Sequence, residues 1–189
     1  MAMTTFFAAL PTRWSGSLPP EGPIGFYRWC VGRAVSAGVR TIVDASGAPL
    51  REALAAKPTI VKPNRAELSK TLNLKIDSDE ALRDAIKKLI ALGPQWAVVS
   101  HGKEATIVSD GREFWRVIPP KVDVINPIGS GDALAAGLAT ALVRGEKVPV
   151  ACKLAVACAC ANAMTAMPGE ITMDDVNALL PQVEVQAWA

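Results

Sequence analysis

The stretch NPIGSGDALAAGLA, residues 126–139, joins a glycine-rich turn to an apolar run with the composition of a buried helix. Gly129 and Gly131 permit a tight turn in which backbone N–H groups converge, and Ser130 between them adds a hydroxyl donor. The first N–H groups of a helix lack partners within the helix and carry the positive end of its dipole, so they attract anions. The stretch therefore predicts an anion site at the start of a helix.

Asp132 places a carboxylate where this anion is expected to bind. Asp is favoured at helix starts, where its side chain accepts hydrogen bonds from free N–H groups, and in this interpretation it has no catalytic task. In the alternative, the carboxylate takes a proton from a substrate hydroxyl while the neighbouring N–H groups hold a phosphoryl group. Residues 129–132 alone leave both interpretations open.

Outward from this stretch, short apolar segments alternate with helical patterns. TIVD (41–44), TIVK (59–62) and WAVVS (96–100) are continuously apolar, which is typical of parallel strands buried on both faces. Helices are predicted at 25–37, 50–56, 64–72, 78–92, 131–143, 150–167 and from Thr172, and Asp110-Gly111 predicts a hairpin between 105–109 and 113–118. The pattern indicates an α/β fold, with ligands at the carboxyl ends of the strands.

Composition and charge exclude several classes of function. The chain has 189 residues, 50% of them hydrophobic, and a net charge of +2, which predicts a folded core and no nucleic-acid partner. Apolar stretches are shorter than the ~20 residues of a membrane span, so no membrane association and a soluble cytoplasmic protein are expected. A single histidine, His101, excludes mechanisms that need two. Cys30, Cys152, Cys158 and Cys160 lack metal-binding spacing and are predicted to be buried thiols.

Further segments accompany residues 126–139 along the chain: SGSLPP (15–20), VDASG (43–47), VKPNRAEL (61–68) and VVSHG (98–102). Residues 126–139 resemble the C-terminal signature of the ribokinase-like (PfkB) carbohydrate kinases at every position, and the other segments are similar to the sugar-phosphate kinase branch. Within that branch, NPIGSGDA and Ala161-Asn162-Ala163 are more similar to tagatose-6-phosphate kinases than to fructose-1-phosphate kinases. The resemblance covers residues 15–180. It implies a three-layer α/β/α fold with a mostly parallel sheet, ATP and Mg²⁺ as cofactors, and a sugar phosphate as substrate.

By this resemblance, Asp132 is the catalytic base, and the amides of Gly129, Ser130 and Gly131 form an anion hole for the transferring phosphoryl group. Phosphoryl transfer depends mainly on positioning and on charge stabilisation, which such a loop can supply. The resemblance also implies that Asn162 lies near the adenine of the nucleotide. A polar residue in an Ala-rich helix can equally be bonded locally, so that alternative stays open.

Asn64 and Glu67 stand three residues apart where a strand leads into a helix. This spacing predicts a capping box, in which each side chain bonds the other residue's backbone N–H. The resemblance implies a second role, in which both residues organise water around Mg²⁺-bound phosphates and Lys62 lies on the nucleotide side. Mg²⁺ keeps several waters and takes few direct protein ligands, so the two roles are compatible.

The resemblance assigns three more residues to the binding sites. Ser100 and Gly102 are implied to line the nucleotide pocket, and Ser17 is implied to face the sugar phosphate, with a turn as the alternative. The chain departs from the family pattern at two positions here. Ala105 stands where a glycine is usual, and His101 replaces an apolar residue, so its imidazole is expected to face solvent or to bond locally.

Family members carry a whole first half before the segment SGSLPP, and the sequence does not contain it. Residues 1–14 are therefore interpreted as an irregular remnant, and residues 15–189 as the nucleotide-binding and catalytic-base portion without the β-lid. The exposed sheet edge and apolar face of such a portion predict self-association into a homo-oligomer. The predicted function is ATP-dependent phosphorylation of a sugar phosphate, impaired in the truncated chain, and the alternative is a non-catalytic nucleotide-binding module. An NAD-binding domain is disfavoured because no GxGxxG follows the first strand.

Overall fold

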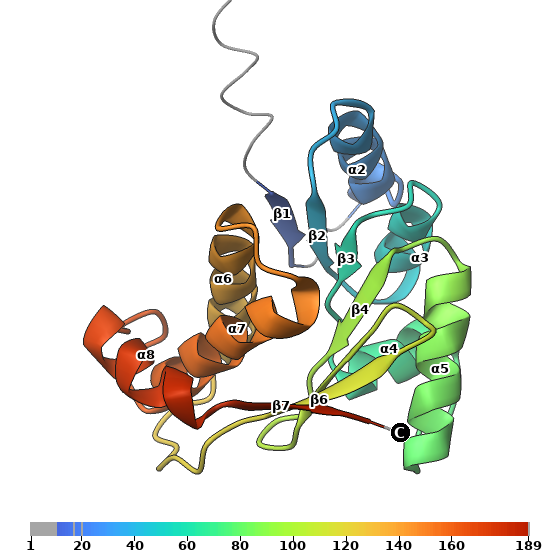
Figure 1. Cartoon of the computed structure of the whole chain (residues 1–189). Helices are drawn as coiled ribbons and strands as arrows, with labels where there is room; N and C mark the ends of the chain where they lie inside the picture. The colour runs from blue at the N-terminus through green and yellow to red at the C-terminus, as the bar shows by residue number, and fades with distance from the viewer. Residues whose placement is uncertain (1–10, 17, 20, 189) are drawn as a thin grey trace, which may run out of the picture. The chain divides into compact units, whose positions relative to one another are not determined.

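The computed structural model describes residues 11–16, 18–19 and 21–188, and these residues form two compact units (Figure 1). Unit 1 contains the described residues up to 100 together with 109–113, and unit 2 contains 101–108 and the described residues from 114 onward. Each unit combines helices with strands. Among the described residues, no helix is both long and apolar enough to cross a membrane.

Unit 1 is built on four parallel strands that follow one another in sequence order. They are β1 (Thr12–Ser15), β2 (Thr41–Asp44), β3 (Ile60–Val61) and β4 (Trp96–Val99). The central strands β2 and β3 are fully buried at Ile42, Val43, Ile60 and Val61, all at 0% exposure, as expected for continuously apolar strands. The predicted α/β class with a mostly parallel sheet is confirmed.

Four helices belong to unit 1. They are α2 (Phe26–Ser36), α3 (Gly47–Leu54), α4 (Arg65–Leu72) and α5 (Asp79–Ala91). Parallel strands in sequence order, joined by right-handed crossovers, place their connecting helices on one face of the sheet. The helices accordingly contact one another in series, α2 with α3, α3 with α4 and α4 with α5. The loops at the carboxyl ends of the strands then lie together at one edge of this sheet.

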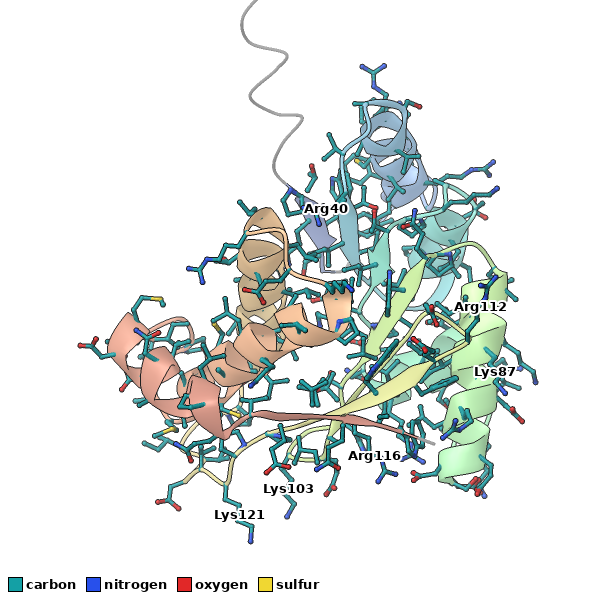
Figure 2. All side chains as sticks on the ribbon, viewed as in Figure 1. Arg40, Lys87, Lys103, Arg112, Arg116 and Lys121 are labelled. Carbon is teal, nitrogen blue, oxygen red and sulfur yellow. The ribbon has the colours of Figure 1, made fainter. Side chains whose placement is uncertain are left out.

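Helix α5 shows how the sequence pattern becomes packing. Ser78 caps the helix by accepting a hydrogen bond from the N–H of Ala81 at 3.1 Å. Leu82, Ile86 and Leu89 are buried on its inner face at 5% exposure or less. Figure 2 shows Lys87 projecting outward from the same helix.

Unit 2 is centred on a pair of packed helices, α6 and α7. Its elements are β6 (Phe114–Ile118), α6 (Ser130–Val143), α7 (Val148–Ala163), α8 (Met173–Leu179), the 3₁₀ helix η1 (Leu180–Gln182), β7 (Glu184–Ala187) and most of β5 (Thr106–Ser109). Gly137 allows α6 to approach α7 closely, because a Cβ there would lie 2.9 Å from both the Cα of Ala155 and the carbonyl oxygen of Leu154. Strands β6 and β7 pair antiparallel.

All four cysteines are free and buried, which confirms the prediction. Three of them lie in α7, and burial raises the pKa of the Cys160 thiol to about 11. Burial raises the pKa of Cys152 further still. Protonated thiols in an apolar setting are inert, so these residues contribute packing rather than chemistry.

Several segments differ from the sequence prediction. Residues 12–14, interpreted as part of an irregular remnant, belong to β1, which pairs with β2. Helix α3 spans Gly47–Leu54 rather than 50–56. Helix α7 ends at Ala163 rather than at Met167, because the Asn162 side chain accepts a hydrogen bond from the N–H of Gly169 at 2.8 Å and the chain turns back there. Strand β7 was not predicted. Its residues are mostly exposed and polar and form no apolar run, and the strand depends on pairing with β6.

Candidate active site

Helix α6 begins at a glycine in the left-handed region of backbone space. Gly129 is its N-cap residue, with φ +82°, and as a glycine it has no side chain with which to cap the helix. Ser130 donates its backbone N–H to the carbonyl of Pro127 at 3.2 Å, which tightens the turn. The Ser130 N–H therefore has a backbone partner in this structure, and the anion hole of the Gly129, Ser130 and Gly131 amides stays a prediction.

Asp132 stands at the third position of α6, in the first helical turn, and is exposed. Gly129 rather than Asp132 occupies the N-cap position, and both the capping and the catalytic interpretation of the Asp132 carboxylate stay open. A carboxylate in the first turn still gains from the helix dipole. Its exposure also leaves it accessible to a substrate hydroxyl, which a general base needs.

Gly129 cannot be replaced without disturbance. A Cβ at this position would lie 2.8 Å from the Cβ of Pro168, and the Asn162 Oδ1 would lie 3.5 Å away. The positive φ of Gly129 is also costly for any residue with a side chain. A glycine is thus required at position 129 for two reasons, the left-handed backbone conformation and the close packing against Pro168.

Two asparagines hold the turn before α6. Asn126 accepts a hydrogen bond from the N–H of Ile128 at 3.0 Å and donates its amide to the carbonyl of Ala166 at 2.9 Å. Asn162 donates its amide to the carbonyl of Ile128 at 2.8 Å, and also contacts the Ser130 hydroxyl at 3.2 Å. Both backbone polar groups of Ile128 are therefore bonded to asparagine side chains.

A second group of predicted residues lies in unit 1, where β2 and β3 end. The ammonium of Lys62 forms an ion pair with Asp44 Oδ2 at 3.1 Å, and Arg13 lies 3.8 Å from the same oxygen. Lys62 is buried, with 4% of its side chain exposed. Burial raises the pKa of Asp44 above its usual value, and Lys62 opposes this rise without cancelling it.

Asn64 and Glu67 form the predicted capping box at the start of α4. The Asn64 Oδ1 accepts from the N–H of Glu67 at 2.9 Å, and the Glu67 Oε2 accepts from the N–H of Asn64 at 2.8 Å. The second carboxylate oxygen of Glu67 takes no part in the box. One carboxylate oxygen and one amide are hard donors of the kind that Mg²⁺ binds directly or through water, so the residues fit that role.

Ser100 joins this group through backbone contacts. It forms a parallel bridge with Asn64, and its carbonyl accepts from the N–H of Arg65 at 2.9 Å. The structure therefore brings Lys62, Asn64, Glu67 and Ser100 together within unit 1. In unit 2 it brings Gly129, Ser130, Gly131, Asp132 and Asn162 together at one helix start.

Two predicted site residues, Gly102 and Ser17, remain. Gly102 belongs to residues 101–108 of unit 2, where it is exposed with φ +54°. His101 beside it is exposed, as expected. Ser17 lies outside the described residues, so its assignment to the sugar phosphate stays a prediction.

Sequence reasoning did not find all of the site. Asn126 was part of the recognised stretch, but its bond to Ala166 spans 40 residues and has no local pattern. The Asp44–Lys62 pair was also missed as a contact, although both residues follow apolar strand segments. Polar residues directly after neighbouring parallel strands were the available signal.

An α/β fold that carries a glycine turn and an acidic residue at a helix start defines a class of phosphate-handling proteins. Residues 7–171 match the pfkB family carbohydrate kinase model. The chain belongs to the pfkB family of carbohydrate kinases.

Known relatives agree with this assignment. Tagatose-6-phosphate kinase of Staphylococcus epidermidis is 37% identical over 174 residues, which cover 90% of this chain and 56% of that protein. Phosphofructokinase-2 from Escherichia coli in complex with potassium superimposes with a TM-score of 0.85 at 27% identity, covering 91% of this chain and 56% of that one. The tetrameric inhibited form of that enzyme gives 0.84 at 26% identity, covering 95% and 58%. The chain thus spans about half the length of the relatives it matches.

Proposed function

We propose that the protein transfers the γ-phosphoryl group of ATP to a hydroxyl of a sugar phosphate, with tagatose 6-phosphate or a fructose phosphate as the acceptor. The observation that carries this proposal is the start of α6, where the cap residue is a left-handed glycine, Gly129, and Asp132 stands exposed in the first turn. The 37% identity to a tagatose-6-phosphate kinase supports the choice of acceptor class.

Asp132 acts as the general base in this proposal. Its carboxylate takes the proton of the acceptor hydroxyl as the oxygen of that hydroxyl attacks the γ-phosphorus, and the bond from phosphorus to the β–γ bridging oxygen breaks to leave ADP. The amides of Gly129, Ser130 and Gly131 stabilise the charge that is spread over the oxygens of the transferring group. A base of this kind contributes ~10²–10⁴-fold to the rate, and oriented amides contribute the remaining stabilisation.

The strand ends of unit 1 would serve the nucleotide. Lys62 is proposed to lie on the nucleotide side, and Asn64 and Glu67 to organise water around Mg²⁺, which neutralises phosphate charge when it is bound. Ser100 and Gly102 are proposed to line the nucleotide pocket. The ion pair with Asp44 holds the Lys62 ammonium in place, and the rest of the Lys62 side chain is buried.

We also propose that the chain self-associates through the outer face of α2. Phe26 and Trp29 stack there with ring centroids 6.5 Å apart, although Phe26 is 43% and Trp29 64% exposed. Ile24, two residues before α2, is also exposed, at 55%. Light scattering of the chain and of Trp29→Ser tests this: association that weakens in the variant supports it, and a monomer at high concentration contradicts it.

The experiment for the main proposal follows ADP release with Mg²⁺, ATP and tagatose 6-phosphate or fructose 6-phosphate. Turnover that is abolished in Asp132→Asn, with ATP binding retained, supports the kinase. The impaired turnover that the sequence analysis expects calls for an assay that is sensitive to slow ADP release.

The second candidate is a nucleotide-binding module without turnover. The module predicts that Mg²⁺·ATP raises the melting temperature while no ADP is released with either acceptor. A ligand that binds only the folded state stabilises it by about 2.7 kcal/mol at 100 times its Kd, so a thermal shift is measurable. Binding without turnover selects the module, and binding with turnover selects the kinase.

A further inference from the structure

We infer that Asn162 is a positioning residue of the phosphoryl-transfer site, which acts through the hydroxyl of Ser130. The inference deepens the proposed kinase function and rests on it. It also replaces the expected contact between Asn162 and the adenine with a contact to the protein's own phosphate loop.

The Asn162 side chain is buried beneath the turn that precedes α6, and the residue is 1% exposed. Its Nδ2 donates to the Ile128 carbonyl at 2.8 Å and to the Ser130 Oγ at 3.2 Å, while its Oδ1 accepts from the Gly169 N–H at 2.8 Å. The opposite orientation of the amide would point its NH₂ group at the N–H of Gly169, so these contacts fix the orientation. All the hydrogen-bonding groups of this amide face protein atoms.

This arrangement determines what Ser130 can do. A serine hydroxyl has one proton to donate and two lone pairs that accept. Because Asn162 donates to the Ser130 oxygen, the hydroxyl proton is directed elsewhere, and Ser130 is only partly buried. Ser130 is thus prepared to donate to an anion in front of the loop, beside the amides of Gly129 and Gly131.

The backbone around Asn162 holds the same geometry. Asn162 bonds both the turn before α6, through Ile128, and the turn after α7, through Gly169. The two turns also meet directly, since Asn126 donates to the carbonyl of Ala166 at 2.9 Å. Donors that are fixed before the substrate arrives stabilise transferring charge without a cost of reorganisation. Asn162 holds the Ser130 hydroxyl in place in this way.

The test compares the affinities of the chain for Mg²⁺·ATP and Mg²⁺·ADP by calorimetry. Asn162→Asp keeps the acceptor for Gly169 but removes the donor to Ser130 and Ile128. We expect Asn162→Asp and Ser130→Ala each to weaken ATP binding at least tenfold and ADP binding much less, because only ATP carries the γ-phosphoryl group. The double variant should lose little more than either single variant, because both remove the same interaction.

Asn126→Asp is the matched control, because Asn126 also bonds Ile128 but no hydrogen bond joins it to Ser130 in the described part of the chain. In the Asn126→Asp variant, Ser130→Ala should still weaken ATP binding as much as it does in the unsubstituted chain. Equal losses for ATP and ADP in Asn162→Asp, or losses that add up in the double variant, overturn the positioning role. If the unsubstituted chain binds no Mg²⁺·ATP at all, the proposed function itself fails.

Asn162→Asp places a carboxyl group in a buried site, so circular dichroism must first show that the variant folds. If it does not fold, the side-chain amide signals of Asn162 in the unsubstituted chain decide the question. Slow hydrogen exchange of these protons, with a shift when Mg²⁺·ATP is added and none with Mg²⁺·ADP, supports the inference. Rapid exchange, or signals that stay in place at saturating ATP, overturn it.

Discussion

The starts of helices α4 and α6 carry an acidic residue at the same position but have different cap residues. Glu67 is the third residue of α4 and folds back onto the N–H of Asn64, which closes the helix start with a complete capping box. Asp132 is the third residue of α6, where the cap is Gly129 with φ +82°, a residue without a side chain. The start of α4 thus has a reciprocal side-chain cap, whereas the cap residue of α6 offers no side-chain acceptor.

The two helix starts differ in the backbone conformation of the cap residue. Asn64 has an extended backbone, with φ −79° and ψ 171°, which brings its N–H within reach of the Glu67 carboxylate. Gly129 is left-handed, and the aspartate at 132 is one methylene shorter than a glutamate. The two helix starts, NRAE at 64–67 and GSGD at 129–132, differ at every position. The capping box stabilises α4, and the start of α6 is the one we propose to receive an anion.

The largest effect is expected for Asp132→Asn, which removes the base from the start of α6. We expect kcat for phosphoryl transfer to fall by ~10²–10⁴-fold, because a general base contributes that much. The free energy of unfolding should change little, since Asp132 is exposed. Glu67→Gln is the comparison on α4, where the amide can still accept from Asn64. An Asp132→Asn variant with undiminished kcat contradicts the division of roles.

Removing the cation next to the start of α4 should cost the most stability. Lys62→Met leaves Asp44 as a buried carboxylate without its nearest partner, which we expect to lower the free energy of unfolding by about 3 kcal/mol at pH 7. The double variant Lys62→Met/Asp44→Asn should recover much of the loss, because it removes the uncompensated charge. Urea denaturation measures the free energy of unfolding of both variants. A Lys62→Met variant as stable as the unsubstituted chain would refute a stabilising role of the Asp44–Lys62 ion pair.

The pH dependence of the same pair has a definite sign. Because burial raises the pKa of Asp44 in the folded state, folding favours its protonated form. The stability that this contributes is present below the ordinary pKa of 3.8 and is lost as pH rises through the higher folded-state pKa. Lys62→Met should extend this loss to higher pH, and Asp44→Asn should abolish it.

Gly129→Ala should destabilise the fold by about 2 kcal/mol or more, because it adds a contact with Pro168 to the strain of a left-handed alanine. Gly145 provides the control in the same unit. Its φ is +83°, and a Cβ there would meet nothing within 4 Å. Gly145→Ala should therefore cost only the backbone strain, about 1 kcal/mol. Equal losses in thermal unfolding of the two variants would show that the Pro168 contact is unimportant.

The smallest effect is expected at the start of α4. Asn64→Ala removes the side chain that accepts from Glu67, and such caps contribute about 1 kcal/mol. Asn64→Gly should cost only a few tenths of a kcal/mol, because glycine is itself a tolerated cap. Urea denaturation of the two variants measures the difference. A loss well above these values for Asn64→Ala would indicate that Asn64 supports more than the start of α4.

The sequence predicted what local patterns can encode. The continuously apolar strands, the capping box at Asn64 and Glu67, and the glycine turn before α6 all depend on residues close in the chain. The contacts that fix the site are long-range: Asn162 meets Ile128 across 34 residues. The pairing of Lys62 with Asp44 likewise depends on the order of the strands in the sheet. No local pattern specifies these partners, so they appear only in the folded structure.

Backbone amide spectra of the chain during a Mg²⁺·ATP titration test the central claim most directly. The account predicts that the signals of Gly129, Ser130 and Gly131 shift progressively and saturate together with binding. It also predicts that added Mg²⁺·ADP moves them less, because ADP lacks the group that this loop receives. Saturable ATP binding that leaves all three signals in place would contradict the account.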